Sequence, residues 1–132
     1  MTQTKTITHW INGALDTGKT ERTSEVFNPA TGQVSANVAL ANVATVDKAV
    51  NVATEAFNSW RHSSLTKRTQ VLFAFRELVL QNKEKIAALI TAEHGKVLSD
   101  ASGEVTRGLE VVEFACGIPH LLKGGFFEEV SS

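Results

Sequence analysis

Apolar and polar residues alternate in the first part of the chain, as they do in a strand with one buried face. The alternation is clearest over residues 33–40. Its apolar members are Val34, Ala36, Val38 and Leu40, and its polar members are Gln33, Ser35 and Asn37. Upstream, Asn12-Gly13 between apolar residues is a strong hairpin signal, and residues 28–32 form a second turn signal with proline and glycine. We therefore expect a small antiparallel β-ribbon over residues 1–41.

The hydrophobic period changes from strand-like to helical at Thr45. Apolar residues then recur at spacings of one, three and four as far as Trp60, which places them on one stripe of a helix. Thr45 is the expected N-cap of this helix. Asp47 would then lie in its first turn, where the helix dipole favours a carboxylate.

A second amphipathic helix is expected to begin near Ser64. Its apolar stripe continues as far as Ile90, and Gly95 is a natural stop signal. The polar run over residues 82–85 interrupts the stripe near its middle. This interruption allows a short break or kink at that point.

A third helix is expected from Ser99 or Asp100 to Cys116, with Gly117 and Pro119 ending it. Helices with apolar stripes must bury them against something. These helices could pack on one another, or they could form the outer layer of a sheet encoded further along a longer chain. Regular signals fade after Gly125, which favours the second arrangement.

The sequence thus predicts a mainly helical chain with a small N-terminal β-ribbon. Its segments are the ribbon at residues 1–41, the amphipathic helices at 42–124 and a tail at 125–132. The composition is 42% hydrophobic and 20% charged, which is typical of a globular protein.

Charge and cysteine content narrow the possible partners. There are 13 basic and 14 acidic residues, for a net charge of −1, so no positive field favours nucleic acid or an anionic membrane. No apolar run approaches the roughly 18 residues of a membrane-spanning helix, and residues 1–10 lack the apolar core of a secretory signal. The single cysteine, Cys116, fits a reducing compartment. We expect a cytoplasmic protein without nucleic-acid or membrane partners.

No complete active site is evident in the sequence. Cys116 falls at a helix C-terminus, where the dipole disfavours a thiolate, so we interpret it as a buried structural residue. The four histidines are dispersed without an i, i+4 pair, and we expect no metal site. No glycine-rich loop follows a strand and opens a helix, as phosphate-binding motifs require.

The segment from Gly103 to Gly108 is the most unusual part of the third helix. Each glycine inside a helix costs about 1 kcal/mol relative to alanine, and two of them suggest close approach of another backbone or a ligand. Arg107 lies between them and could present its planar guanidinium to a carboxylate. From the residues alone, a surface ion pair is the more common outcome. The available acidic partners are Glu104, Glu110 and Glu113.

Four stretches resemble the N-terminal pattern of aldehyde dehydrogenases. They are Trp10-Ile11-Asn12-Gly13, Val26-Phe27-Asn28-Pro29-Ala30-Thr31-Gly32, Glu93-His94-Gly95-Lys96 and the helix from Ala53 to Trp60. The segment from Arg107 to Pro119 is most similar to the CoA-acylating methylmalonate-semialdehyde dehydrogenase branch.

This resemblance implies an enzyme that oxidises a semialdehyde with NAD and transfers the acyl group to CoA. In that branch, an arginine at this helix position binds the substrate carboxylate, and Arg107 matches that arginine. The resemblance therefore favours a substrate-binding role for Arg107 over a surface pair. The family's nucleophile motif lies far downstream, so Cys116 does not inherit its role, and the NAD-binding strands are also missing.

We therefore expect an N-terminal fragment of the α/β aldehyde dehydrogenase fold. It would hold no catalytic, cofactor-binding or metal-binding residue, and it would be inactive alone. The alternative is a small helical binding or assembly module derived from such an enzyme. Exposed apolar helix faces would favour a homo-oligomer in either case.

Overall fold

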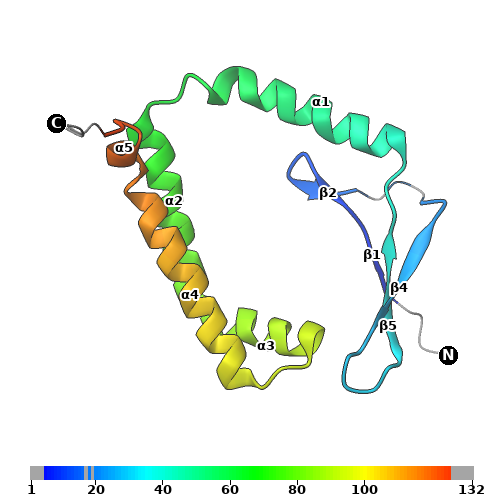
Figure 1. Ribbon diagram of the computed structural model, residues 1–132. Helices are drawn as coiled ribbons and strands as arrows, with labels where there is room; N and C mark the ends of the chain where they lie inside the picture. Colours follow the sequence, from blue (N-terminus) through cyan, green and yellow to red (C-terminus); the bar gives the residue numbers. More distant parts are fainter. Residues whose placement is uncertain (1–4, 17, 19, 126–132) are drawn as a thin grey trace, which may run out of the picture. The chain divides into compact units, whose positions relative to one another are not determined.

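A computed structural model describes residues 5–16, 18 and 20–125, and it confirms the predicted order of strands followed by helices (Figure 1). The chain forms two compact units. The first holds the described residues up to His62 together with Ala92–Gly95, and the second holds the others. All of the strands lie in the first unit, and most of the helical core lies in the second.

The first unit contains a three-stranded sheet in the order β1-β5-β4. Its strands are β1 (Lys5–Ile7), β4 (Thr23–Phe27) and β5 (Val34–Ala39). β4 pairs antiparallel with β5, as the turn signal predicted, and Gly32 takes φ 71° in the turn between them. β1 pairs with the other edge of β5 in parallel, which the sequence did not predict. The sheet is therefore mixed rather than purely antiparallel.

The alternation predicted for β5 ends earlier than expected. Ala36 is buried as predicted, but the second buried position is Ala39, and Leu40 is exposed. The strict alternation is lost inside the strand, where Asn37 and Val38 are both half-buried between Ala36 and Ala39. Strand β5 ends at Ala39, and the Leu40 backbone N still donates to the Arg22 carbonyl at 3.0 Å.

The Asn12-Gly13 hairpin is confirmed as a separate two-stranded sheet. Strand β2 (Trp10–Ile11) pairs antiparallel with β3 (Ala14–Leu15). Asn12 and Gly13 have φ values of 58° and 72°. Positive φ at both central positions is the requirement of a type I′ turn, which explains this dipeptide.

Helix α1 (Val43–Trp60) begins earlier than predicted, because its N-cap is Asn42 and not Thr45. The Asn42 side-chain Oδ1 accepts hydrogen bonds from the Thr45 backbone N and from Thr45 Oγ1, both at 2.9 Å. Thr45 thus lies inside the first turn as a donor to the cap. Asparagine is at least as good a cap as threonine, so the residue three positions upstream takes that role.

The predicted interruption of the second helix is a complete break. Helix α2 (Leu65–Gln81) ends at Asn82, and α3 (Lys83–His94) begins directly after it. Asn82 leaves the helical region, and its side-chain Nδ2 donates to the Leu78 carbonyl at 2.9 Å. Gly95 follows α3 with φ 83°, which confirms its role as a helix stop.

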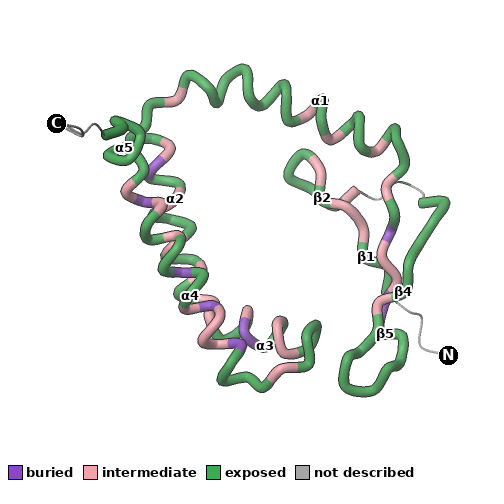
Figure 2. Tube along the Cα trace, viewed as in Figure 1, coloured by how far each residue is buried: buried purple, intermediate pink, exposed green. Residues whose placement is uncertain are grey.

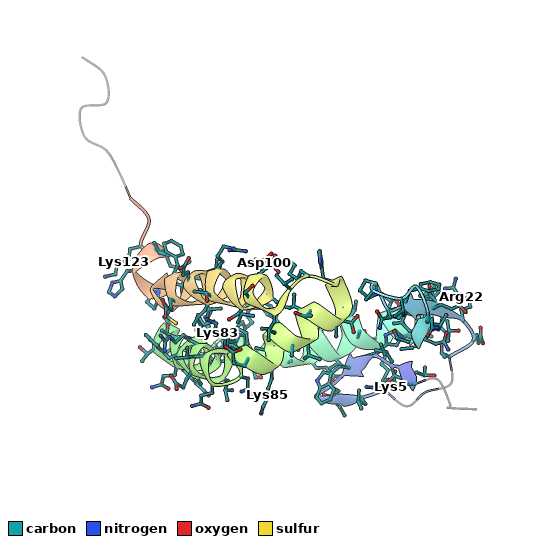
Figure 3. The ribbon with its side chains drawn as sticks, turned by 90° about the horizontal axis from the view of Figure 1, so that it is seen from below. Lys5, Arg22, Lys83, Lys85, Asp100 and Lys123 are labelled. Atoms are coloured by element: carbon teal, nitrogen blue, oxygen red, sulfur yellow. The ribbon has the colours of Figure 1, made fainter. Side chains whose placement is uncertain are left out.

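Helix α4 (Leu98–Cys116) carries Asp100 in its first turn, where a carboxylate complements the helix dipole (Figure 3). Gly117 ends α4 as predicted, but Pro119 does not act as a terminator. It lies in the first turn of the short helix α5 (Ile118–Leu121). Proline suits that position, because its φ is already helical and no donor is needed there.

The core of the second unit is small. α2 and α4 pack side by side (Figure 1), and Ala87, Ala101 and Val105 form a buried cluster. Figure 2 shows buried positions as single purple bands among intermediate and exposed residues. No large side chain among the described residues is fully buried. None of the helices in the described part of the chain has the length and apolar character needed to cross a bilayer.

Candidate functional site

Arg107 lies in the middle of α4, and its side chain is 69% exposed. The guanidinium Nη1 lies 3.8 Å from the position that a Cβ on Gly103 would occupy. The side chain therefore runs back toward the helix N-terminus, as helical side chains do, and passes over Gly103. The missing side chain at Gly103 leaves the guanidinium accessible on that side.

The nearest acidic group to Arg107 is the Glu104 carboxylate, one turn earlier. Arg107 Nη2 and Glu104 Oε1 are 3.9 Å apart, too far for a hydrogen bond. The Arg107 guanidinium donates no hydrogen bond to any residue in the described ranges. Of the predicted surface partners, Glu113 pairs with Arg76 instead, at 2.7 Å from Arg76 Nη2. Arg107 therefore carries a positive charge that is only loosely paired.

Lys96 is a third charged residue beside Glu104 and Arg107. It follows the Gly95 stop, and its Nζ donates to Glu104 Oε1 in an ion pair. The Lys96 side chain is 18% exposed and that of Glu104 is 38% exposed, so this pair is the more buried part of the group. In the sequence, Lys96 is part of the Glu93-His94-Gly95-Lys96 stretch. Its contact with Glu104 on α4 was not predicted.

The two glycines of α4 leave an open helix surface on either side of Arg107. A Cβ on Gly108 would meet no atom within 4 Å, and one on Gly103 would meet only Arg107. The close backbone approach that these glycines suggested is thus not found among the described residues. The open surface leaves room beside the guanidinium for a bound group.

Cys116 is buried and unpaired at the end of α4, as predicted. It lines an open depression of about 530 Å³ with Phe73, Arg76, Glu77 and Glu113. The Glu113 carboxylate raises the pKa of Arg76 by accepting hydrogen bonds from its guanidinium. Because that cation is already bound to Glu113, the depression does not present a free charge to an anionic ligand.

Asp16 forms a local ion pair in the first unit. Asp16 accepts a hydrogen bond from the Gly18 backbone N at 3.2 Å and pairs with Lys48 at 3.3 Å. The Gly18 N–H, and after it Lys48, hold the pKa of Asp16 below its usual value. The described residues contain no group of three or more histidine, cysteine or acidic side chains able to hold a metal ion. His94 is the last residue of α3.

Comparison with known proteins gives consistent matches. The model of the aldehyde dehydrogenase family matches residues 16–131. Malonate-semialdehyde dehydrogenase of Pseudomonas aeruginosa is 46% identical over 127 residues, which are 95% of this chain and 25% of that protein. The enzyme of the same name from Listeria monocytogenes serotype 4b is 40% identical over all of this chain and 27% of its own length.

Solved structures give the same result for the fold. A provisionally assigned methylmalonate-semialdehyde dehydrogenase from Sinorhizobium meliloti, complexed with NAD, has a TM-score of 0.87 and 39% identity. The match covers 100% of this chain and 27% of the Sinorhizobium meliloti protein. Aldehyde dehydrogenase 21 from Physcomitrella patens, in complex with the reaction product succinate, has a TM-score of 0.79 and 25% identity over 98% of this chain and 27% of its own.

The chain spans about a quarter of the length of the curated relatives that it matches. Its helix-rich fold with small N-terminal sheets corresponds to that share of their structures. The family match covers most of the chain, and the relatives share up to 46% identity with it. On this evidence the chain belongs to the aldehyde dehydrogenase family.

Proposed function

We propose that this chain supplies the carboxylate-binding part of a malonate- or methylmalonate-semialdehyde dehydrogenase, with Arg107 as the residue that binds the substrate carboxylate. The observation that carries the proposal is the loosely paired guanidinium of Arg107 on a helix surface opened by glycine. A planar guanidinium can donate two parallel hydrogen bonds to a carboxylate, which fixes both the position and the orientation of the ligand.

The relatives support a substrate that bears a carboxylate. Malonate semialdehyde, in the names of the relatives from Pseudomonas and Listeria, is an aldehyde with a carboxylate at its far end. Succinate, the product held by the Physcomitrella enzyme, is a dicarboxylate. In the proposed whole enzyme the aldehyde carbon is oxidised with NAD and the acyl group passes to CoA. Arg107 would hold the opposite end of the substrate.

The described residues do not fit a cofactor site. No glycine-rich loop in the described ranges joins a strand to the start of a helix, so no step of the NAD chemistry is assigned to them. Cys116 is buried next to the Arg76–Glu113 pair and is not proposed as the nucleophile. We therefore expect the chain alone to form no NADH above background with NAD, CoA and methylmalonate semialdehyde.

The role of Arg107 is tested in a hybrid enzyme. In it this chain replaces the matched quarter of the Pseudomonas aeruginosa malonate-semialdehyde dehydrogenase. Arg107→Gln removes charged hydrogen bonds worth about 1.5–3 kcal/mol, so kcat/KM for malonate semialdehyde should fall by about 10- to 100-fold. Propanal, which has no carboxylate, should be oxidised as before.

Arg61→Gln is the matched control, because Arg61 is also an exposed arginine at a helix surface. It should leave both substrates unaffected. An Arg107→Gln enzyme that keeps its preference for malonate semialdehyde over propanal would refute the proposed role. An equal loss for both substrates would refute it too, because the preference for malonate semialdehyde over propanal would then be unchanged.

A second candidate function is that of an assembly module. It is favoured by large apolar side chains that are about two-thirds exposed, among them Trp10, Val111 and Phe114. Exposed apolar surface of this kind drives association between protein chains. Val111 and Phe114 follow Arg107 by four and seven positions on α4, so the three residues share one helix face and the two functions would compete for it.

A further inference from the structure

Lys96, Glu104 and Arg107 form a row of alternating charges on and beside α4. Glu104 Oε1 is the oxygen nearest to both cations: it accepts a hydrogen bond from Lys96 Nζ and lies 3.9 Å from Arg107 Nη2. The row carries a net charge of +1, since two cations flank one carboxylate. That charge suits a ligand with a single carboxylate.

We propose that Lys96 is a positioning residue that keeps Arg107 available for the substrate by holding Glu104 away from it. The inference rests on the proposed carboxylate-binding role of Arg107 and adds to it a residue outside the contact with substrate. Lys96 acts on Glu104, and through Glu104 on Arg107.

Without Lys96, Glu104 has a ready alternative partner. Residues three positions apart on a helix are neighbours, and a glutamate and an arginine at that spacing form ion pairs. A shift of about 1 Å would bring Glu104 Oε1 from 3.9 Å to hydrogen-bond distance of Arg107 Nη2. The substrate carboxylate would then have to displace Glu104 from the guanidinium.

The exposure of the three side chains explains why Glu104 stays with Lys96. Lys96 is 18% exposed, whereas Arg107 is 69% exposed. A partly buried ammonium loses more water contact than an exposed guanidinium, so it depends more on a carboxylate partner. Glu104 is therefore bound at the more buried end of the row, and the exposed end stays open.

A simpler role for the Lys96–Glu104 pair is to fasten the segment after α3 to α4. That role predicts an effect on stability but none on the guanidinium of Arg107. The two roles are separated by observing Arg107 directly in the full 132-residue chain. Nitrogen-15 NMR of its side chain reports the Nε–Hε shift and the rotation of the Nη groups, and both change when a carboxylate binds the guanidinium.

Three variants and one control make the test. In Lys96→Met, Glu104 should pair with Arg107, which slows Nη rotation and shifts the Nε–Hε signal. Glu104→Gln and the double variant Lys96→Met/Glu104→Gln should both resemble the wild type. Lys85→Met, at an exposed lysine in α3, is the control and should change nothing. An unchanged Arg107 signal in Lys96→Met would overturn the proposal.

The consequence for substrate is measured in the hybrid enzyme. Lys96→Met should raise KM for malonate semialdehyde by about two- to fivefold, the effect expected of a partly exposed ion pair that competes with substrate, and leave propanal unchanged. The double variant should return KM toward the wild-type value. A double variant as impaired as Lys96→Met would contradict the positioning role and support the fastening role.

The outcomes also separate this inference from the proposed function. If Arg107→Gln leaves the preference for malonate semialdehyde intact, the carboxylate-binding role fails and the kinetic part of this inference fails with it. If Arg107→Gln behaves as expected but Lys96→Met changes neither NMR signal nor KM, only the inference about Lys96 fails.

Discussion

Arg107 and Cys116 lie on the same helix in opposite environments. The guanidinium of Arg107 is exposed and loosely paired, whereas the thiol of Cys116 is buried at the end of α4. A group that binds a ligand must be reached from solvent, and a nucleophilic cysteine must be reached and activated. The exposure of the two side chains therefore agrees with the proposed ligand-binding role of Arg107 and with a packing role for Cys116.

The sequence alone did not determine the role of Arg107. Its residues favoured a surface pair with a neighbouring glutamate, and only the family resemblance favoured a carboxylate-binding role. In the structure, Glu104 Oε1 lies 3.9 Å from Arg107 Nη2, and Glu113 forms an ion pair with Arg76. The Lys96–Glu104 pair could not be predicted, because it depends on how the chain turns at Gly95 between two helices.

Asp16 gives a prediction for the dependence of stability on pH. Its pKa is lowered in the folded state by the Gly18 N–H and by Lys48. A carboxyl group with a lowered folded pKa stabilises the protein above its unfolded pKa of about 3.9 and loses that contribution as the pH falls through the folded value. Asp16→Asn should therefore be less stable than wild type at pH 7, and the difference should disappear as the pH falls below the lowered folded pKa of Asp16.

The measurement is urea unfolding of both proteins between pH 2 and pH 7. In a Lys48→Met background the effect of Asp16→Asn at pH 7 should be smaller, because one of the two causes is gone. A difference between Asp16→Asn and wild type that persists unchanged at pH 2 would argue against a charge effect.

The helices were predicted well because their signals are local. An apolar stripe, a capping side chain and a stopping glycine all act within a few residues. The break at Asn82 and the stop at Gly95 are examples. Errors arose where two residues compete for one role, as Asn42 and Thr45 do at the start of α1.

Strand β1 shows why the sheet was harder to predict. Its partner is β5, with Lys5 opposite Ala36 and Ile7 opposite Val38. Such parallel pairing joins segments far apart in sequence and leaves no turn signal between them. The three residues of β1 are also too few to show a convincing period.

The cap of α1 provides a test at the level of the element. Asn42→Ala removes the side chain that accepts two hydrogen bonds from Thr45, and it should lower the free energy of unfolding by about 1 kcal/mol. Asn51→Ala, at an exposed position inside the same helix, should be neutral or slightly stabilising because alanine is the better helix former. Urea unfolding followed by circular dichroism gives both values. Equal stabilities of the two variants would show that Asn42 is not the cap.

At the level of the whole molecule, the hydrophobic core of the described residues is small. The buried cluster of the second unit contains two alanines and one valine, and no large side chain in the described residues is fully buried. Its relatives carry about four times the length in one polypeptide. We expect the apolar helix surface that stays exposed to associate with an apolar surface of another chain.

Association of the chain follows from this exposure. Val111 and Phe114, three positions apart on α4, are 68% and 69% exposed. We expect light scattering to show a dimer or larger species whose mass rises with concentration. Val111→Lys/Phe114→Lys should reduce that mass, whereas Gln70→Lys/Gln81→Lys, at exposed polar positions of α2, should not. A wild-type chain that stays monomeric and unfolds cooperatively would contradict this expectation.

The central claim is that Arg107 binds the carboxylate of the substrate, and reversal of its charge tests that claim most directly. The measurement is the ratio of kcat/KM for malonate semialdehyde to that for aminoacetaldehyde, a small cationic aldehyde, in the hybrid enzyme with and without Arg107→Glu. The account predicts that the ratio falls by at least about 100-fold, because one substrate loses its counter-charge and the other gains one. A ratio unchanged by Arg107→Glu, in an enzyme that still oxidises propanal, would contradict it.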